Sequence, residues 1–416
     1  MAKIKPFCGV RFNAKGVGRL SKVVCPPYDV INKQQRQGYI KKSKYNAVSL
    51  VLPKGKNKLA GHRNSKKALG AWLEKGILIR DKQPSLYVYL QRYKIDGATK
   101  SRLGFISLLE LEDIRKKKVL PHEKIFDKFK FERFDLMKTT QAHLSPIFFL
   151  FNDKARKVEG LLSLAVRNRK PLIDINTEGV KEKLWRIQNS NFISGLRRLM
   201  SKKIIFIADG HHRFEASVIL RDYLREKQRH RGHNMPYDYT MAYFLSMQNK
   251  GLAILPIHRT VKYLPDNFSK RFMLKELSKY FSIDIMKSKK KLLKKLQMIG
   301  KQEKHAFGFF YNNTYIFAVL EDNKIISNIG SLNNCLSWKR LDVSILHYFI
   351  FPKLLNIKER VNRKRNIYYY RGASSAVRMV KSGEFEMAIF LNPTKIEQVE
   401  SIAKSNNRMP HKSTYF

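Results

Sequence analysis

The chain has 416 residues, and its share of hydrophobic residues (43%) is enough for a large core, which excludes wholesale disorder. The formal net charge is +50, the three cysteines form no CxxC motif, and no apolar run is long enough to span a bilayer. Because the N-terminus also lacks the apolar region of a signal peptide, we expect a cytoplasmic protein with reduced thiols. Its length suits two domains.

The first 150 residues mix predicted strands and helices without a regular βαβ repeat, which favours the α+β class. A helix at 66–75 is expected to end at Gly76. Alternation and apolar runs predict strands at 47–52, 86–93, 104–111 and 146–151. A strand and helix at 204–226, with strands at 241–247 and 253–261, are expected to complete a first domain of residues 1–262.

After about residue 262 the pattern changes, and we expect a second α+β domain at 263–416. Helices are predicted at 266–280, 289–299 and 341–351. Strands are predicted at 305–310, 314–320 and 386–391, the first two joined by a turn at Asn312-Asn313.

The most informative stretch is Asp-Gly-His-His-Arg at 209–213, which follows a buried strand and begins a helix. A helix start attracts anions, Gly210 lets the backbone approach closely, and Arg213 can add a forked cation. The pattern predicts a phosphate-binding corner made by Gly210, His211, His212 and Arg213.

Two other interpretations of this stretch remain open. The histidines can form a solvated helix start, with Arg213 paired to Asp209 or Glu215. A zinc site is the third interpretation, but adjacent histidines on a helix project in different directions, so we predict no protein-bound metal cluster.

Three further places carry ionisable groups beside prolines. Tyr28 and Asp29 follow two prolines that stiffen the chain, and they are candidates for substrate binding or for an ordinary helix entry. His122 and Glu123 follow Pro121, so Glu123 is a candidate general base with His122 beside it, or an exposed ion-pair partner.

Two histidines complete the candidates. His143, within the stretch 139–146, lines the same cleft or caps a helix. His258 ends a predicted strand and is a candidate substrate contact, although a histidine satisfied within the sheet is the competing interpretation.

The high charge invites a nucleic-acid partner, because a basic surface attracts phosphate chains without sequence preference. The basic clusters are scattered along the chain, however, and lysine-rich drift in genome composition gives the same pattern. No zinc finger, basic zipper or RNP signature is found in the sequence. We therefore expect non-specific binding to nucleic acid at most.

Taken together, these motifs resemble the bacterial and archaeal domain-of-unknown-function family 1015 nearly end to end. The matching segments are 20–31, 120–123, 142–148, 184–187, 207–213, 254–259, 341–344, 391–395 and 409–416. Relatives usually carry alanine at the position of Cys25 and asparagine at that of His143, so the resemblance assigns no site role to these two.

The box at 209–213 also looks like that of the ParB/sulfiredoxin superfamily, in which this corner binds nucleotide phosphates and which includes free-serine kinases. The resemblance implies a ParB/sulfiredoxin-like mixed-sheet core, with ATP or ADP and Mg²⁺ as cofactors. By analogy, Asp209 would serve metal or proton chemistry and Glu123 would act as base.

The function that follows is a nucleotide-dependent small-molecule phosphotransferase acting on an amino-acid hydroxyl. Two alternatives stay open: a nucleotide-gated, ParB-like nucleic-acid-binding protein, and a non-catalytic binder of a phosphorylated metabolite.

Overall fold

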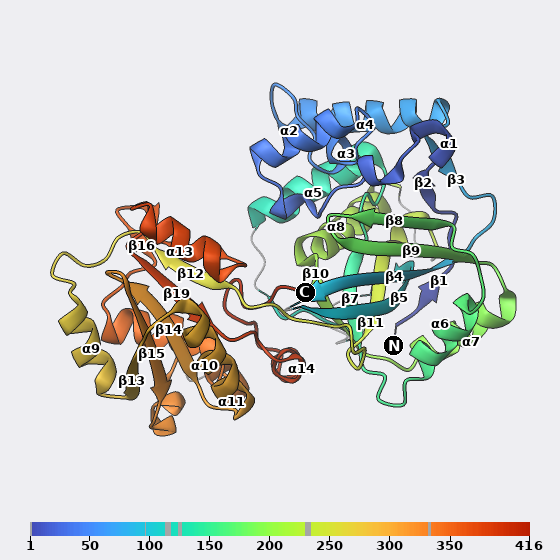
Figure 1. The fold of residues 1–416 in the computed structure, drawn as a ribbon. Helices are drawn as coiled ribbons and strands as arrows, with labels where there is room; N and C mark the ends of the chain where they lie inside the picture. Colours follow the sequence, from blue (N-terminus) through green and yellow to red (C-terminus); the bar gives the residue numbers. More distant parts are fainter. Residues whose placement is uncertain (1, 96, 113–117, 124–126, 229–233, 332–333) are drawn as a thin grey trace. The chain divides into compact units, whose positions relative to one another are not determined.

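The computed structural model describes residues 2–95, 97–112, 118–123, 127–228, 234–331 and 334–416. The chain forms two compact units. Unit 1 comprises Met1–Pro121 and Ile125–Leu252, and unit 2 comprises His122–Lys124 and Ala253–Phe416. The colours of Figure 1 follow the chain through both units.

Unit 1 is built on a nine-stranded mixed sheet in the order β6-β10-β7-β11-β5-β4-β9-β8, with β1 paired to β5. Its strands are β1 (Ile4–Lys5), β4 (Leu86–Ile95), β5 (Ala98–Glu110), β6 (Val119–Leu120), β7 (Ile147–Phe151), β8 (Ile173–Thr177), β9 (Val180–Ile187), β10 (Ile205–Asp209) and β11 (Tyr239–Ser246). Strand β10 is parallel to β6 and antiparallel to β7, whereas β11 is parallel to β7. This mixture of directions confirms the α+β class with a mixed-sheet core.

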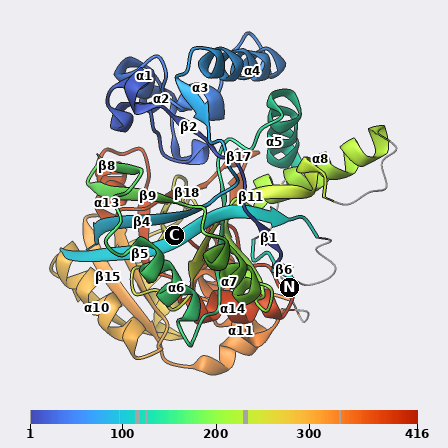
Figure 2. The ribbon, with the colours of Figure 1, turned by 90° about the vertical axis from the view of Figure 1, so that its right-hand side faces the viewer.

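The helices of unit 1 pack against this sheet and against one another. They are α1 (Ala14–Val17), α2 (Lys33–Lys42), α3 (Val48–Val51), α4 (Lys58–Glu74), α5 (Asp127–Thr140), α6 (Lys157–Val166), α7 (Ser190–Met200) and α8 (His211–Lys227), and a short hairpin joins β2 (Val10–Phe12) to β3 (Leu78–Arg80). Figures 1 and 2 show α4 and α5 next to each other and apart from α6 and α7, and α5 packs against α8. The rings of Phe105, Phe149 and Phe244 stack in the core at centroid distances of 5.0 and 5.5 Å.

Unit 2 contains a six-stranded antiparallel sheet in the order β13-β15-β14-β19-β12-β18. Its strands are β12 (His258–Val261), β13 (Phe281–Met286), β14 (Ala306–Tyr311), β15 (Thr314–Leu320), β18 (Ile367–Tyr370) and β19 (Met387–Leu391), with a separate hairpin of β16 (Arg360–Val361) and β17 (Lys364–Arg365). Asn312 and Asn313 both have positive φ (44° and 53°), which is the turn expected between two adjacent strands.

The helical elements of unit 2 cover this sheet. They are α9 (Lys270–Ser278), α10 (Lys289–Lys301), η5 (Asn323–Asn328), α11 (Leu336–Lys339), α12 (Asp342–Ile345), the π-helix η6 (Leu346–Leu354), α13 (Ala373–Lys381) and α14 (Ile396–Lys404). Within the described ranges, no helix combines the length and the apolar character needed to cross a membrane.

The structure corrects two predicted strands. The run at 47–52 forms the helix α3, and the Asn46 side chain, one residue before the N-cap Ala47, accepts a hydrogen bond from the Val48 N–H (3.0 Å) in an Asx turn that leads into the helix. The stretch 253–261 yields only β12, which pairs with β18 and β19 in unit 2 and does not complete the sheet of unit 1. The single helix expected at 341–351 is α12 followed by η6.

Candidate functional site

The corner between β10 and α8 has the predicted strand-to-helix geometry. Gly210 adopts φ 94° and ψ 29°, a left-handed conformation, and the Phe214 N–H donates to the Gly210 carbonyl at 3.0 Å as α8 begins. A Cβ atom on Gly210 would lie 2.7 Å from Nη2 of Arg213. Only glycine therefore combines this backbone turn with the close approach of the guanidinium.

The guanidinium of Arg213 is held within unit 1. Its Nη1 donates to Ser145 Oγ (2.9 Å) and to the Pro146 carbonyl (2.6 Å), and its Nη2 donates to Asp209 Oδ2 (2.6 Å). The Arg213 side chain is 12% exposed and that of Asp209 49%. The pairing of Arg213 with Asp209 that the sequence left open is present, and Arg213 fixes the corner to the start of β7.

Tyr28 and Asp29 lie near this corner, in the turn η2 (Tyr28–Val30). Burial raises the pKa of Tyr28, while the charges of Arg133 and Arg213 lower it and those of Asp29 and Asp209 raise it. The Arg133 guanidinium carbon lies 4.1 Å from the centroid of the Tyr28 ring. Two motifs that are 180 residues apart in the sequence therefore share one electrostatic neighbourhood.

Tyr28, Arg133 and Arg213 line a hollow of about 30 Å³. It is lined by Tyr28, Val51, Arg133, Leu136, Met137, His143, Leu144, Ser145, Ile147 and Arg213. This volume accommodates a water molecule. A larger ligand would therefore have to bind on the exposed side of the corner, where Asp209 lies.

Three histidines beside the corner, His143, His211 and His212, are packed against protein groups. The Nε2 atom of His143 lies 3.1 Å from the Tyr239 carbonyl, and burial lowers the pKa of His143 to about 4, so the ring is neutral. The side chain of His211 is buried, and the ring of His212 lies 5.5 Å from that of Phe129 in α5. If His211 binds a ligand, its main chain is the part that does so.

Cys25, in the loop before Tyr28, is not a reactive thiol. Burial raises its pKa to about 12, which keeps it protonated at neutral pH.

His122 and Glu123 belong to unit 2, where they contact the C-terminal tail. The Met409 N–H donates to the His122 carbonyl at 2.7 Å, and His122 Nε2 lies 3.1 Å from Thr414 Oγ1. His411 Nδ1 lies 3.5 Å from Glu123 Oε1, and both side chains are about one third exposed. Two motifs that are far apart in the sequence thus meet in an isolated parallel β-bridge between Glu123 and Met409, which no local pattern could reveal.

His258, also in unit 2, is a core histidine. It is 4% exposed, and its Nδ1 accepts a hydrogen bond from the Leu391 N–H at 3.4 Å. Burial, followed by the charge of Arg259, lowers the pKa of His258 to about 4. A neutral ring that is bonded within the sheet fits the competing interpretation of this residue.

Arg133 is the residue at the corner that the sequence did not indicate. It is 5% exposed, and its Nη1 donates to the Val51 carbonyl at 3.0 Å while Nη2 pairs with Glu132 at 2.9 Å. No motif marks it, because it lies in α5, a helix that the sequence pattern did not predict.

Residues 209–213 can contribute one carboxylate, that of Asp209, to a metal ion. Across the described residues, no group of three or more His, Cys, Asp or Glu side chains is arranged to hold a metal. Mg²⁺ is commonly held by one or two carboxylates together with phosphate oxygens, so Asp209 fits a magnesium ion that arrives with a nucleotide.

Comparison with known proteins identifies a family and some distant structural likenesses. A family model described as "Protein of unknown function (DUF1015)" matches residues 4–344. No curated protein matches the chain. Similar solved structures include a free serine kinase in complex with AMP, with 13% identity and a TM-score of 0.34. The alignment covers 74% of this chain and 86% of the kinase chain.

Two more solved structures share this level of likeness. A conserved hypothetical protein from Pyrococcus furiosus has 13% identity and a TM-score of 0.33, with 74% of this chain and 89% of that one covered. SbnI from Staphylococcus aureus, truncated at its C-terminus, has 8% identity and a TM-score of 0.32, with 74% and 80% covered. At these scores the likenesses carry no argument about the site.

Proposed function

Since the chain belongs to the family described as "Protein of unknown function (DUF1015)", a description that assigns no activity, we propose a function from the corner at 209–213. The protein is a nucleotide-dependent small-molecule phosphotransferase that acts on a hydroxyl group, such as that of an amino acid. The observation that carries this proposal is the left-handed Gly210 between β10 and the N-terminus of α8, with Asp209 half-exposed beside it.

This geometry suits the phosphates of ATP or ADP. The N-terminal end of a helix carries roughly half a positive charge, and its N–H groups point outward along the axis. With 17 residues, α8 is long enough for this effect to be fully developed. In the proposal, the main chain at Gly210, His211 and His212 binds the phosphates.

Arg213 has a double role in the proposal. Its hydrogen bonds to Ser145, Pro146 and Asp209 hold the corner in shape, and its charge lies within one helical turn of the phosphates. Asp209 is positioned by Arg213 to bind a Mg²⁺ ion. When bound, Mg²⁺ would supply charge neutralisation for the transferring phosphoryl group.

The remaining site residues are assigned by their chemistry. Tyr28 and Asp29 are the proposed substrate contacts in unit 1, because Tyr28 shares its electrostatic surroundings with Arg213 and Asp209. Glu123, with His122 beside it, is the proposed base for the substrate hydroxyl, since its carboxylate is one third exposed. His258 is left out of the proposal because its ring is buried and bonded within the sheet.

The first test is nucleotide binding by Arg213→Ala. We expect the affinity for ATP and ADP to fall by roughly tenfold or more, equivalent to ~1.4 kcal/mol, because the corner loses its charge and its support. Isothermal titration calorimetry measures this. Arg198→Ala, which removes an exposed arginine from α7, is the matched control. Equal affinity in the wild-type and Arg213→Ala proteins would contradict the proposal.

The second test separates binding from chemistry. Glu123→Gln should keep the affinity for ATP and lose nucleotide consumption in the presence of Mg²⁺ and a panel of hydroxyl-bearing amino acids, because an amide cannot accept the hydroxyl proton. Glu384→Gln, an exposed acid in the same unit, should consume nucleotide at the wild-type rate. If the Glu123→Gln protein still consumes nucleotide at the wild-type rate, Glu123 is not the base.

The alternatives predict different results in the same assays. A non-catalytic binder would bind nucleotide in the wild type and consume none. A nucleotide-gated nucleic-acid binder, which the net charge of +50 favours, would change its affinity for DNA when nucleotide is added. An affinity for DNA that does not change when nucleotide is added would not support this alternative, because any strongly basic protein binds DNA in this way.

A further inference from the structure

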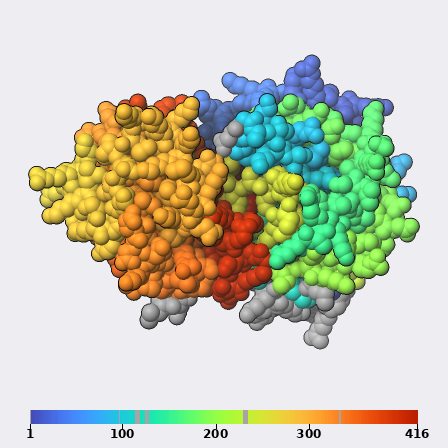
Figure 3. Space-filling model, turned by 60° about the horizontal axis from the view of Figure 1, so that its bottom comes forward, coloured from blue at the N-terminus to red at the C-terminus, as the bar shows by residue number. Residues whose placement is uncertain are grey.

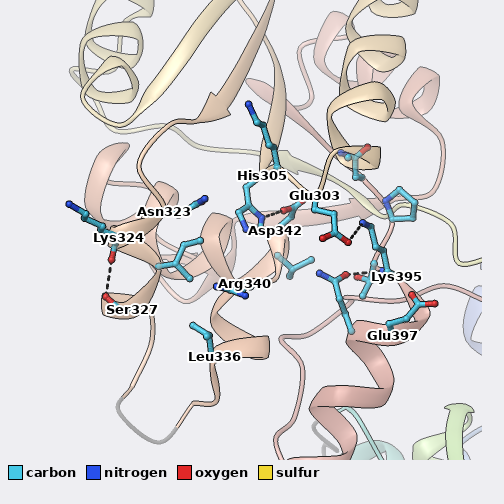
Figure 4. Close-up of a pocket in the computed structure, with 18 residues that line it drawn as sticks. Glu303, His305, Asn323, Lys324, Ser327, Leu336, Arg340, Asp342, Lys395 and Glu397 are labelled. Carbon is cyan, nitrogen blue, oxygen red and sulfur yellow. Dashed lines mark hydrogen bonds and ion pairs between the residues drawn. The ribbon is translucent and has the colours of Figure 1, made fainter.

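Unit 2 contains a hollow of about 560 Å³ that includes none of the site residues predicted from the sequence. This volume lies within the usual range for small-molecule sites. Figure 4 shows Asn323 and Lys324 on one side and Lys395 and Glu397 on the other, with His305, Asp342 and Arg340 between them.

Several separate segments of unit 2 form the walls. They are the end of α10 and the residues that follow it, η5, the α11–α12 region, and the loop that leads from β19 into α14. Figure 3 shows the red surface of the C-terminal segment continuous with the orange surface of the preceding helices, in agreement with the packing of α11 against α14.

Hydrogen bonds fix the loop between β19 and α14. Asn392 Nδ2 donates to the Leu296 carbonyl at 2.9 Å, and Lys395 N–H donates to Gln398 Oε1 at 2.9 Å. Thr394 Oγ1 donates to the Ser413 carbonyl at 2.8 Å. The wall is therefore formed before any ligand binds, which lowers the entropic cost of binding.

The hollow is lined by four lysine or arginine cations and three carboxylates, Glu303, Asp342 and Glu397. Glu303 pairs with Lys395 at 3.4 Å, and Asp342 is engaged by His305, which leaves Glu397 as the one lining carboxylate with no ion pair among the described residues. Among the residues that the structure describes, the other three cations of the hollow take part in no ion pair; they are Lys304, Lys324 and Arg340. The planar guanidinium of Arg340 can bind two oxygens of one phosphate or carboxylate group.

His305 supplies a second kind of recognition. Its Nδ1 lies 2.8 Å from Asp342 Oδ1, and the two side chains are only 13% and 19% exposed. A carboxylate on Nδ1 fixes the orientation and tautomer of the imidazole, which leaves Nε2 as the nitrogen for a ligand. An imidazole of fixed orientation beside cations without ion pairs suits a ligand that carries an anionic group and a neighbouring polar group.

We propose that this hollow binds a small organic anion of metabolite size. Its phosphate or carboxylate group is bound by Arg340, Lys304 and Lys324, and a neighbouring hydroxyl contacts His305. The site is separate from the corner at 209–213 and does not depend on the phosphotransferase proposal.

Calorimetry on the full-length protein at physiological ionic strength tests this, with ribose 5-phosphate, citrate and inorganic phosphate as probes. We expect at least one probe to bind, and its identity tells an organic phosphate from a carboxylate. Arg340→Gln should lower the affinity for that probe by roughly tenfold, equivalent to ~1.4 kcal/mol. Arg378→Gln, an exposed arginine on α13, is the matched control and should leave affinity unchanged.

The control matters because a chain with a net charge of +50 attracts any anion. Equal losses in Arg340→Gln and Arg378→Gln, or no binding of the three probes at millimolar concentration, would overturn the proposal. If Arg340→Gln fails to fold, Lys324→Gln replaces it with the same expected direction. A probe that Arg213→Ala abolishes binds at the other corner, which refutes this inference and leaves the proposed function standing.

Discussion

At the scale of single residues, Gly210 decides whether the corner exists. We predict that Gly210→Ala lowers both the stability of unit 1 and the affinity for nucleotide. Left-handed backbone strains an alanine by about 1–2 kcal/mol, and the new Cβ would also meet the Arg213 guanidinium at 2.7 Å.

The matched control is Gly179→Ala, in the turn between β8 and β9. Gly179 has φ +85°, but a Cβ there meets no atom within 4 Å, so only the backbone strain remains. Urea unfolding and calorimetry with ADP should show the larger loss in Gly210→Ala. Similar losses in the two variants would mean that the contact with Arg213 is unimportant.

The residue scale also shows what the sequence could and could not predict about the site. The strand, the glycine and the helix start at 209–213 are local features, and the structure confirms this local geometry. The partners of Arg213 were not predictable beyond Asp209. Ser145 and Pro146 reach Arg213 only because β7 pairs with β10, a contact across more than 60 residues.

At the scale of elements, the helix α3, which the sequence pattern predicted as a strand, depends on the buried side-chain amide of Asn46. Asn46 is fully buried, and its Nδ2 donates to the carbonyls of Lys22 (2.8 Å) and Val24 (3.0 Å) while its Oδ1 accepts from Val48. A short apolar run is compatible with a strand or a helix, so its type was decided by these contacts with a segment 22 residues earlier.

We predict that Asn46→Ala destabilises unit 1 by about 2–4 kcal/mol, because three hydrogen bonds of a fully buried amide are lost, two to the carbonyls of Lys22 and Val24 and one from the Val48 N–H. Asn57→Ala removes the exposed cap of α4, whose Oδ1 accepts from Ala60 at 2.9 Å, and should cost only ~1 kcal/mol. Denaturant titrations of the two variants compare these costs. Equal values would show that the two hydrogen bonds from Asn46 to the carbonyls of Lys22 and Val24 add no stability.

At the scale of the whole molecule, three histidines with lowered pKa make stability depend on pH; His258 is buried, and His143 and His347 are half-buried. Burial lowers the pKa of His143 and of His258 to about 4, and that of His347 to about 3. In the unfolded chain these groups titrate near 6.5. Between these values the unfolded chain binds more protons than the folded one.

The free energy of unfolding should therefore fall as pH drops from about 6.5 towards 4, by up to roughly 1.4 kcal/mol per pH unit for each histidine. Urea unfolding near pH 7 and near pH 5 measures this. His143→Gln, which keeps an N–H donor for the Tyr239 carbonyl, should reduce the slope. A free energy that is flat over this range contradicts the burial of neutral histidines.

The high charge acts at the same scale and was plain from the sequence. A net charge of +50 disfavours the compact state by self-repulsion, and protonation of histidines at low pH adds to it. Charge alone, however, predicted neither the 560 Å³ hollow nor its pairing of His305 with Asp342, because the residues that meet there come from segments up to about 100 residues apart.

The path of the chain has a practical consequence. Residues 122–124 belong to unit 2, although the segments before and after them, Met1–Pro121 and Ile125–Leu252, belong to unit 1. All residues from Ala253 onward belong to unit 2. A fragment beginning at Ala253 would lack Glu123, which forms an isolated β-bridge with Met409, and His122, whose carbonyl accepts from the Met409 N–H. Producing the second half as an independent protein would require a circular permutation or a grafted peptide, not a single truncation.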